Sequence, residues 1–155
     1  MLNKLRDSQL EKIEAAEKIA EGNLEHKINS LSEQDFLSKS FEKMIENLNK
    51  LAMEIKFLTT ASIKGNSSAR GNTKVFSGGY KTIIEGMNST LDAVYDPINE
   101  ATSALEKLGA GDFTIKITKE YAGDHERIKK SINSVTQSLG NTLTEVAQAV
   151  SATAS

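Results

Sequence analysis

The feature that most limits the fold of this chain is a heptad spacing of apolar residues in three separate stretches. In the clearest stretch these residues advance by alternating steps of four and three: Leu37, Phe41, Met44, Leu48, Leu51, Ile55 and Leu58. The same spacing runs from Tyr80 to Leu108 and from Ile128 to Ala149. It places the apolar side chains on one narrow stripe of a helix, which a lone helix cannot shield from water. The sequence therefore predicts long helices that require partner helices.

Composition favours an elongated helical bundle with a narrow core, since 38% of the 155 residues are hydrophobic but only 5% are aromatic. The net charge is −2 with both signs interspersed, so we expect no face for nucleic acid. The absence of Cys excludes disulfides and thiolate zinc sites. No run approaches the roughly 18 apolar residues of a membrane helix. We therefore expect a soluble, cytoplasmic segment, with an inner-membrane anchor in the parent protein left open.

Glycines divide the chain into repeated units. The pairs Gly22-Asn23, Gly65-Asn66 and Gly111-Asp112 recur at intervals of 43 and 46 residues. Glycine adopts the left-handed conformation that ends many helices. Intervals near 45 residues indicate a tandem array of one unit, and Met87-Asn88 likewise falls on Ile132-Asn133. The helices predicted from these signals cover about residues 2–21, 32–62, 80–108 and 124 onward, with Ser32 marking the start of the second.

The connectors between these helices are too long for antiparallel neighbours. Each has about 11 to 15 residues, whereas two to eight suffice to join antiparallel helices. A returning connector between parallel helices explains this length. Two parallel helices still leave a stripe exposed, so we expect two chains to pair into a parallel four-helix bundle. Pro97, inside the third helix, should bend it or cost about 3 kcal/mol.

The first repeat resembles the HAMP domain, the signal-relay module of bacterial chemoreceptors and sensor histidine kinases. The resemblance rests on Ile19-Ala20-Glu21-Gly22-Asn23-Leu24, on Ile28 and on Ser32-Glu33-Gln34-Asp35. The family opens its second helix with Asp-Glu-x-Gly. Glu33 matches the glutamate, while Ser32 and Asp35 stand where Asp and Gly are usual.

The other repeats resemble the family to different degrees. The third repeat keeps Gly111-Asp112-Phe113 and Ile117, and has Tyr121-Ala122-Gly123-Asp124 before its second helix. In the second repeat, Ser67 and Gly71 replace two apolar connector residues, and Phe76 is expected to substitute for them. Its Phe76-Ser77-Gly78-Gly79 signature is similar to the divergent modules of poly-HAMP receptors.

The resemblance implies an all-α fold of three HAMP-like modules, stacked end to end in a parallel homodimer. The expected boundaries are 1–51, 45–94 and 92–142, with adjacent modules sharing a helix. Residues 143–155 are similar to the Ala- and Ser-rich opening of a receptor signalling coiled coil. We therefore expect this segment to lie between an upstream sensor and a downstream signalling domain of the same chain.

The candidate functional residues are structural. Gly22, Gly65 and Gly111 are expected to end first helices, and Glu33 is the switch candidate by family resemblance. Connector residues Leu24, Ile28, Phe113 and Ile117 are expected to pin the connectors. The remaining candidates lie on the stripes or at connector ends: Leu37, Phe41, Met44, Leu48, Phe76, Gly78, Met87, Asp112, Gly123 and Ile132.

Enzymatic readings fit the sequence poorly. His125-Glu126-Arg127-Ile128 only faintly resembles a histidine-kinase phosphoacceptor box, and His26 has no neighbouring metal ligands. We therefore expect no catalytic site, cofactor, metal or small-molecule substrate. The expected function is a chemoreceptor signal relay. The alternatives are a static coiled-coil rod or adaptor, and the relay segment of a sensor histidine kinase.

Overall fold

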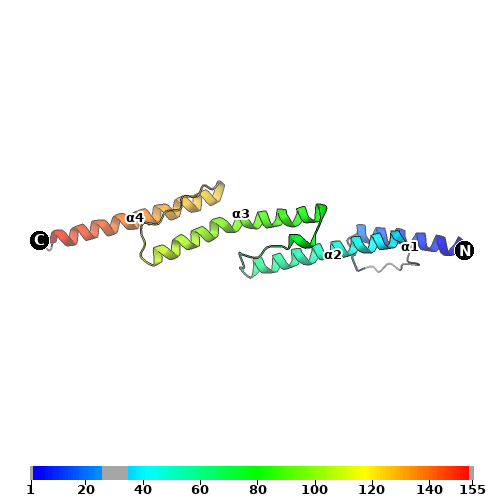
Figure 1. Cartoon of the computed structure of the whole chain (residues 1–155). Coiled ribbons are helices and arrows are strands. Elements are labelled where there is room, and N and C mark those ends of the chain that lie inside the picture. Colours follow the sequence, from blue (N-terminus) through cyan, green and yellow to red (C-terminus); the bar gives the residue numbers. More distant parts are fainter. Residues whose placement is uncertain (1, 26–34, 154–155) are drawn as a thin grey trace. The chain divides into compact units, whose positions relative to one another are not determined.

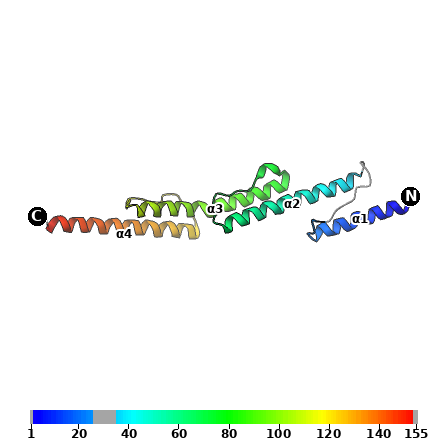
Figure 2. The same ribbon diagram turned by 90° about the horizontal axis from the view of Figure 1, so that it is seen from below.

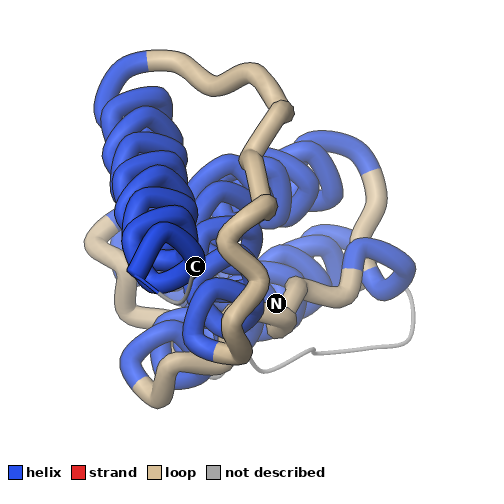
Figure 3. The backbone as a smooth tube through the Cα atoms, turned by 90° about the vertical axis from the view of Figure 1, so that its left-hand side faces the viewer, coloured by secondary structure: helices blue, strands red, loops and turns tan. Residues whose placement is uncertain are grey.

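The structure is a computed structural model that describes residues 2–25 and 35–153. Within these ranges the chain is helical and contains no strand, as Figure 3 shows, so the predicted all-helical fold is confirmed. The elements are α1 (Leu2–Ala20), α2 (Phe36–Ile63), a 3-10 turn η1 (Thr73–Val75), α3 (Gly78–Gly109) and α4 (Gly123–Thr153).

The chain divides into two compact units, Met1–Asn88 and Ser89–Ser155, with the boundary inside α3. In the first unit, α1 and α2 run in the same direction (Figures 1 and 2). In the second, the C-terminal part of α3 and the start of α4 lie side by side and also run in the same direction. The connector between α3 and α4 travels back along them, which accounts for its length.

One hydrogen-bonding pattern ends α1, α2 and α3. Gly22, Gly65 and Gly111 have φ values of 82°, 74° and 91°, in the left-handed region that glycine adopts without strain. The N–H of the next residue donates to the carbonyl five positions back: Asn23 to Lys18, Asn66 to Ala61 and Asp112 to Lys107. These bonds satisfy carbonyls that the ending helix would leave unpaired. The chain then turns into the connector.

The structure corrects the predicted start of the second helix. Helix α2 begins at Phe36, four residues after Ser32. Asp35 is its N-cap residue, because its carboxylate accepts a hydrogen bond from the Ser38 N–H. The second connector contains the 3-10 turn η1. Pro97 lies inside α3 without ending it.

Each unit has a small apolar core that includes connector residues. In the first unit, Phe76 of the connector is buried, as are Leu58 and Ala61 of α2 and Ile84 of α3. In the second unit the buried cluster consists of Ala101, Ala104, Ile117 and Ile132, with Ile115 and Tyr121 packed against it. Much of each heptad stripe lies outside these cores and is exposed in the single chain.

Candidate functional site

The candidate site of the second unit is the joint between its connector, residues 110–122, and helices α3 and α4. Ile117 lies near the middle of this connector and is 5% exposed. It clusters with Ala101 and Ala104 of α3 and with Ile132 of α4. The small alanine side chains leave room for the isoleucine. The connector thus belongs to the core and joins the two helices.

Asn133 of α4 binds the backbone of the same connector residue twice. The Ile117 N–H donates to Oδ1 of Asn133 at 2.9 Å, and Nδ2 of Asn133 donates to the Ile117 carbonyl at 3.0 Å. One carboxamide therefore satisfies both backbone groups of a residue whose side chain is buried. We call this pair of hydrogen bonds the asparagine clamp.

The first unit contains a second asparagine clamp. The Gly71 N–H donates to Oδ1 of Asn88 at 2.7 Å, and Nδ2 of Asn88 donates to the Gly71 carbonyl at 3.0 Å. Gly71 is buried, and a Cβ built on it would lie 2.7 Å from Cγ2 of Ile84. The connector backbone therefore packs directly against α3. Sequence reasoning missed this role of Asn88 and Asn133, although their 45-residue interval is the signal that could have revealed it.

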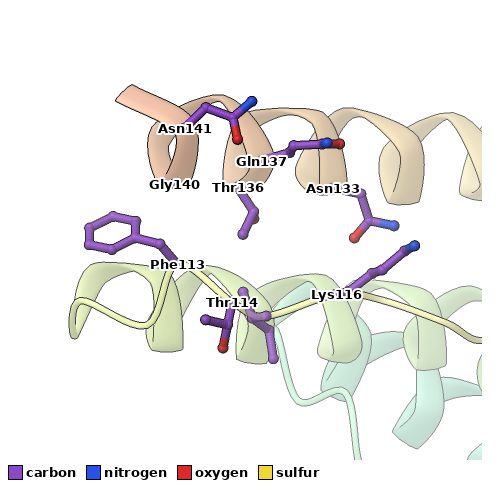
Figure 4. A pocket seen from close by; sticks show the side chains of 9 residues that line it. Phe113, Thr114, Lys116, Asn133, Thr136, Gln137, Gly140 and Asn141 are labelled. Carbon is purple, nitrogen blue, oxygen red and sulfur yellow. The ribbon is translucent and has the colours of Figure 1, made fainter. Parts of the chain in front are cut away.

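Beside the Asn133 clamp of the second unit lies an open groove of about 350 Å³ between the connector and α4 (Figure 4). Phe113, Thr114 and Lys116 line it from the connector. On the α4 side, a Cβ built on Gly140 would lie 3.4 Å from the Phe113 carbonyl oxygen, so the connector passes close to the helix there. The lining carries amide, hydroxyl and ammonium groups.

A polar side chain after each helix-ending glycine folds the start of the connector. Asp112 accepts hydrogen bonds from the Thr114 hydroxyl at 2.7 Å and from its N–H at 3.0 Å. These bonds hold the pKa of Asp112 below its usual value, the hydroxyl bond having the larger effect. Asn66 makes the corresponding bonds to Ser68, and Asn23 accepts one from the Glu25 N–H. These are Asx turns, which redirect the chain immediately after each helix.

The connector between α1 and α2 is held by an ion pair. Nζ of Lys12 in α1 lies 2.9 Å from Oδ1 of Asp35, and the two side chains are 13% and 8% exposed. Asp35 also accepts a hydrogen bond from the Ser38 hydroxyl at 2.9 Å. At the other end of this connector, Asn49 donates to the Leu24 carbonyl at 3.1 Å. The predicted residues Ile28 and Glu33 lie outside the described residues.

The structure places the other predicted residues as follows. Gly78 and Gly123 are the first residues of α3 and α4, with φ values of 55° and 56°. Leu37 is exposed, although it belongs to the predicted stripe. The half-buried positions are Leu24, Phe41, Met44, Leu48, Met87 and Phe113.

The structure also bears on the histidine and the metal binding considered in the sequence analysis. His125 lies in the first turn of α4, and its buried Nδ1 has no hydrogen-bond partner within the described part of the chain. Over residues 2–25 and 35–153, no group of three or more His, Asp or Glu side chains is placed to hold a metal ion. In the same ranges, no helix combines the length and apolarity of a membrane span.

In the second unit, two parallel helices are joined by a returning connector that packs into their core (Figure 1). Residues 75–141 match the family model of the HAMP domain. This segment is a HAMP domain. The third module was expected to cover residues 92–142. The match begins earlier, at residue 75, and ends one residue before the expected end. A comparison with curated protein sequences gives no match.

The HAMP domain contains the whole joint between α3 and α4, including Ile117 and Asn133. HAMP domains relay signals between sensor and output domains, which implies such a role for this segment. The packed connector and the clamp are thus parts of a signal-relay module.

Proposed function

We propose that this chain is the relay segment of a bacterial chemoreceptor, built as a parallel homodimer of three stacked HAMP-like modules. In this proposal it carries conformational change from an upstream sensor to a downstream signalling domain and has no enzymatic activity of its own. The modules are those expected from the sequence, 1–51, 45–94 and 92–142. The HAMP domain at residues 75–141 supports the relay role.

The observation that carries the homodimer is the exposed part of the heptad stripes. Val94, Ile98 and Leu105 follow heptad spacing on α3, and Ile128, Val135 and Leu139 do so on α4. These six side chains are between 40% and 51% exposed in the single chain. Covering them gains about 25 cal/mol for each Å² of apolar surface removed from water. A second copy in the same orientation presents the matching stripes and closes a four-helix bundle.

A relay requires two packings of the bundle that differ by only a few kcal/mol, so that an input can favour either one. The second unit has features that suit such a balance. Ala101 and Ala104 occupy core positions, and small side chains limit the packing energy that favours one arrangement. Gly140 lies inside α4, where glycine costs about 1 kcal/mol relative to alanine.

Cysteine crosslinking tests the parallel dimer directly, because the chain has no Cys of its own. Ile98→Cys places a thiol on the exposed stripe, and Asn99→Cys places one on a neighbouring exposed position of the same helix. We expect rapid oxidative dimerisation of Ile98→Cys in dilute solution and little of Asn99→Cys. Leu48→Cys with the exposed control Lys50→Cys repeats the comparison on α2. Equal yields at test and control positions, or a monomer in sedimentation, would contradict the homodimer.

Amide hydrogen exchange separates a relay from a static rod. A relay should show unequal protection among the modules, because its switching elements open at lower cost than its most stable core. Uniform protection along the helices would favour the static coiled-coil alternative.

A fusion experiment distinguishes the two receptor classes. The segment is fused to a chemoreceptor signalling domain or to a histidine-kinase core, and the output that it controls is measured.

A further inference from the structure

Two connector residues of the second unit, Lys119 and Tyr121, connect α3 with the start of α4. The Tyr121 hydroxyl donates to Oε2 of Glu100 on α3. On α4, the hydrogen bond from Lys129 lowers the pKa of Glu126 below its usual value, and the nearby Tyr121 backbone adds a smaller part of this shift. Lys119 contacts both helices directly. Its Nζ lies 3.5 Å from Oδ2 of Asp96 on α3, and its carbonyl accepts a hydrogen bond from Lys129 of α4 at 3.3 Å.

The partners on each helix form a pair on one face. Asp96 and Glu100 are four residues apart on α3, so their carboxylates lie one turn from each other. Glu126 and Lys129 are three residues apart on α4 and form an ion pair at 2.8 Å, with side chains only 24% and 15% exposed. Nζ of Lys119 also lies 5.5 Å from the centroid of the Tyr121 ring, which links the two connections.

We propose that Lys119 and Tyr121 form a bridge that fixes the position of the start of α4 along α3, and so sets the packing state of this HAMP domain. The inference rests on the proposed relay function. Tyr121 is only two residues before α4 begins at Gly123. A shift of α4 along its axis therefore cannot be absorbed by slack in the chain, and it must stretch or break the bonds to Asp96 and Glu100.

Pro97 places a deformable point of α3 at the same turn. It lies between Asp96 and Glu100, is buried, and has no N–H to donate to the carbonyl of Ala93. A proline inside a helix permits a local bend at the preceding turn. The bridge thus connects the start of α4 to the part of α3 that bends at the lowest cost. Lys119 and Tyr121 are positioning residues for the relay, which the sequence analysis did not identify.

A distance measurement inside one chain tests the bridge. Spin labels at Asn99→Cys on α3 and Ser134→Cys on α4 occupy exposed positions outside the bridge. Mixing labelled chains with excess unlabelled chains restricts the signal to distances within one chain. We expect one narrow distance distribution in the parent protein. Tyr121→Phe, which removes only the hydroxyl group, and Glu100→Ala should broaden the distribution and shift its mean.

Two further variants separate positioning from general destabilisation. Glu100→Gln keeps an acceptor oxygen for the Tyr121 hydroxyl and should preserve the narrow distribution. Glu106→Gln changes an exposed carboxyl group elsewhere on α3 and should leave it unchanged. Circular dichroism shows whether each variant is folded, and Tyr121→Phe keeps the proposal testable if Glu100→Ala does not fold. An unchanged distribution in folded Tyr121→Phe, or an equal shift in Glu106→Gln, would overturn the bridge.

The outcome for the bridge can be read apart from the outcome for the relay. Sedimentation of the same samples reports whether the chain is a dimer, whereas the distance reports only on α3 and α4 within one chain. A monomer with a shifted distance in Tyr121→Phe would reject the homodimer and support the bridge. A dimer with unchanged distances would reject the bridge alone.

Discussion

The connector of the first unit that precedes α3 and the connector of the second unit that precedes α4 solve one packing problem in different ways. In the second unit, the Ile117 side chain fills the space beside α3 and α4. In the first, Gly71 has no side chain, and the backbone itself approaches Ile84. Both residues are nevertheless held by an asparagine clamp on the helix that follows.

This difference shows that the joint is defined by the backbone bonds more than by the residue that fills it. A carboxamide pairs with one N–H and one carbonyl whatever side chain lies between them, so glycine and isoleucine can occupy equivalent places. The filler decides how close the connector lies to the helix. The two fillers should therefore fail in opposite ways, one when it is made smaller and the other when it is made larger.

Shrinking the side-chain filler should have the largest effect. Ile117→Ala removes most of a side chain that is 5% exposed and leaves a cavity in the second core, which typically costs about 2–5 kcal/mol. Urea denaturation at one fixed chain concentration measures this loss. Thr118→Ala, at the exposed neighbouring position, should change stability by less than about 0.5 kcal/mol. A loss below about 1 kcal/mol for Ile117→Ala would show that the connector is not part of the core.

Enlarging the glycine filler should cost less, about 1–3 kcal/mol, which is typical of overpacking. In Gly71→Ala the new Cβ would lie 2.7 Å from Cγ2 of Ile84 and 3.3 Å from Cδ1 of Leu58. Ile84 is fully buried and branched at Cβ, so it has little freedom to move aside. Urea denaturation is again the measurement.

A double-mutant cycle shows whether the cost of Gly71→Ala comes from Ile84. Ile84→Ala is itself destabilising, but it removes the atom that the new Cβ would meet. Gly71→Ala should therefore cost less in the Ile84→Ala background than in the parent chain. Strict additivity would mean that the glycine is required for another reason.

Removing a clamp should have an effect similar to that of Gly71→Ala in both units. Asn133→Ala removes two part-buried hydrogen bonds to the Ile117 backbone. A hydrogen bond contributes about 0.5–1.5 kcal/mol net, so the pair should contribute about 1–3 kcal/mol. Asn88→Ala should do the same for Gly71. The control is Asn141→Ala on the exposed surface of α4.

Amide exchange gives a local reading of the same experiment. The Ile117 N–H should exchange faster in Asn133→Ala, and the Gly71 N–H faster in Asn88→Ala. Unchanged exchange at both amides would show that the clamps do not hold the connectors. A change in only one unit would break the equivalence of the two joints.

Heptad spacing predicted three of the four helices, and the glycines predicted where α1, α2 and α3 end, because both signals are local. Gly22, Gly65 and Gly111 end the helices where predicted, since a left-handed residue is required there whatever surrounds it. The predicted start of α2 was wrong because several polar residues near it are suitable N-cap residues. Ser32 and Asp35 both fit the rule, and only the folded chain places the Asp35 carboxylate on the Ser38 N–H.

The joints were harder to predict because their contacts join residues far apart in the sequence. Ile117 was identified as an apolar connector residue, and it is buried. Gly71 was interpreted as the loss of an apolar contact, whereas the structure shows a close backbone approach that requires glycine. The bond between Tyr121 and Glu100 joins residues 21 positions apart, and no local pattern distinguishes Glu100 from the other carboxylates of α3.

The smallest expected effect distinguishes the ends of the two connectors. Before α3 the aromatic residue is Phe76, which has no hydroxyl group, and before α4 it is Tyr121. Burial, the hydrogen bond to Glu100 and the nearby charges of Glu100 and Asp96 raise the pKa of Tyr121 to about 12 from 10.0. Lys119 and the Glu126 carboxylate also face this residue.

Because the folded state holds the Tyr121 proton more tightly than the unfolded state, this contribution to stability is complete below pH 10. It is lost as the pH rises from about 10 towards 12, since the unfolded chain then releases the proton first. Stability should therefore fall less steeply over this interval in Tyr121→Phe than in the parent chain, because other groups titrate equally in both. Phe76→Tyr adds a hydroxyl group at the first connector end, but a hydroxyl alone does not supply the Glu100 carboxylate that holds the proton on Tyr121. If stability fell equally steeply with rising pH in the parent and Tyr121→Phe chains, the Tyr121 hydroxyl would not be bound to Glu100. Tyr121 and Phe76 would then each contribute only an aromatic ring to their connector ends.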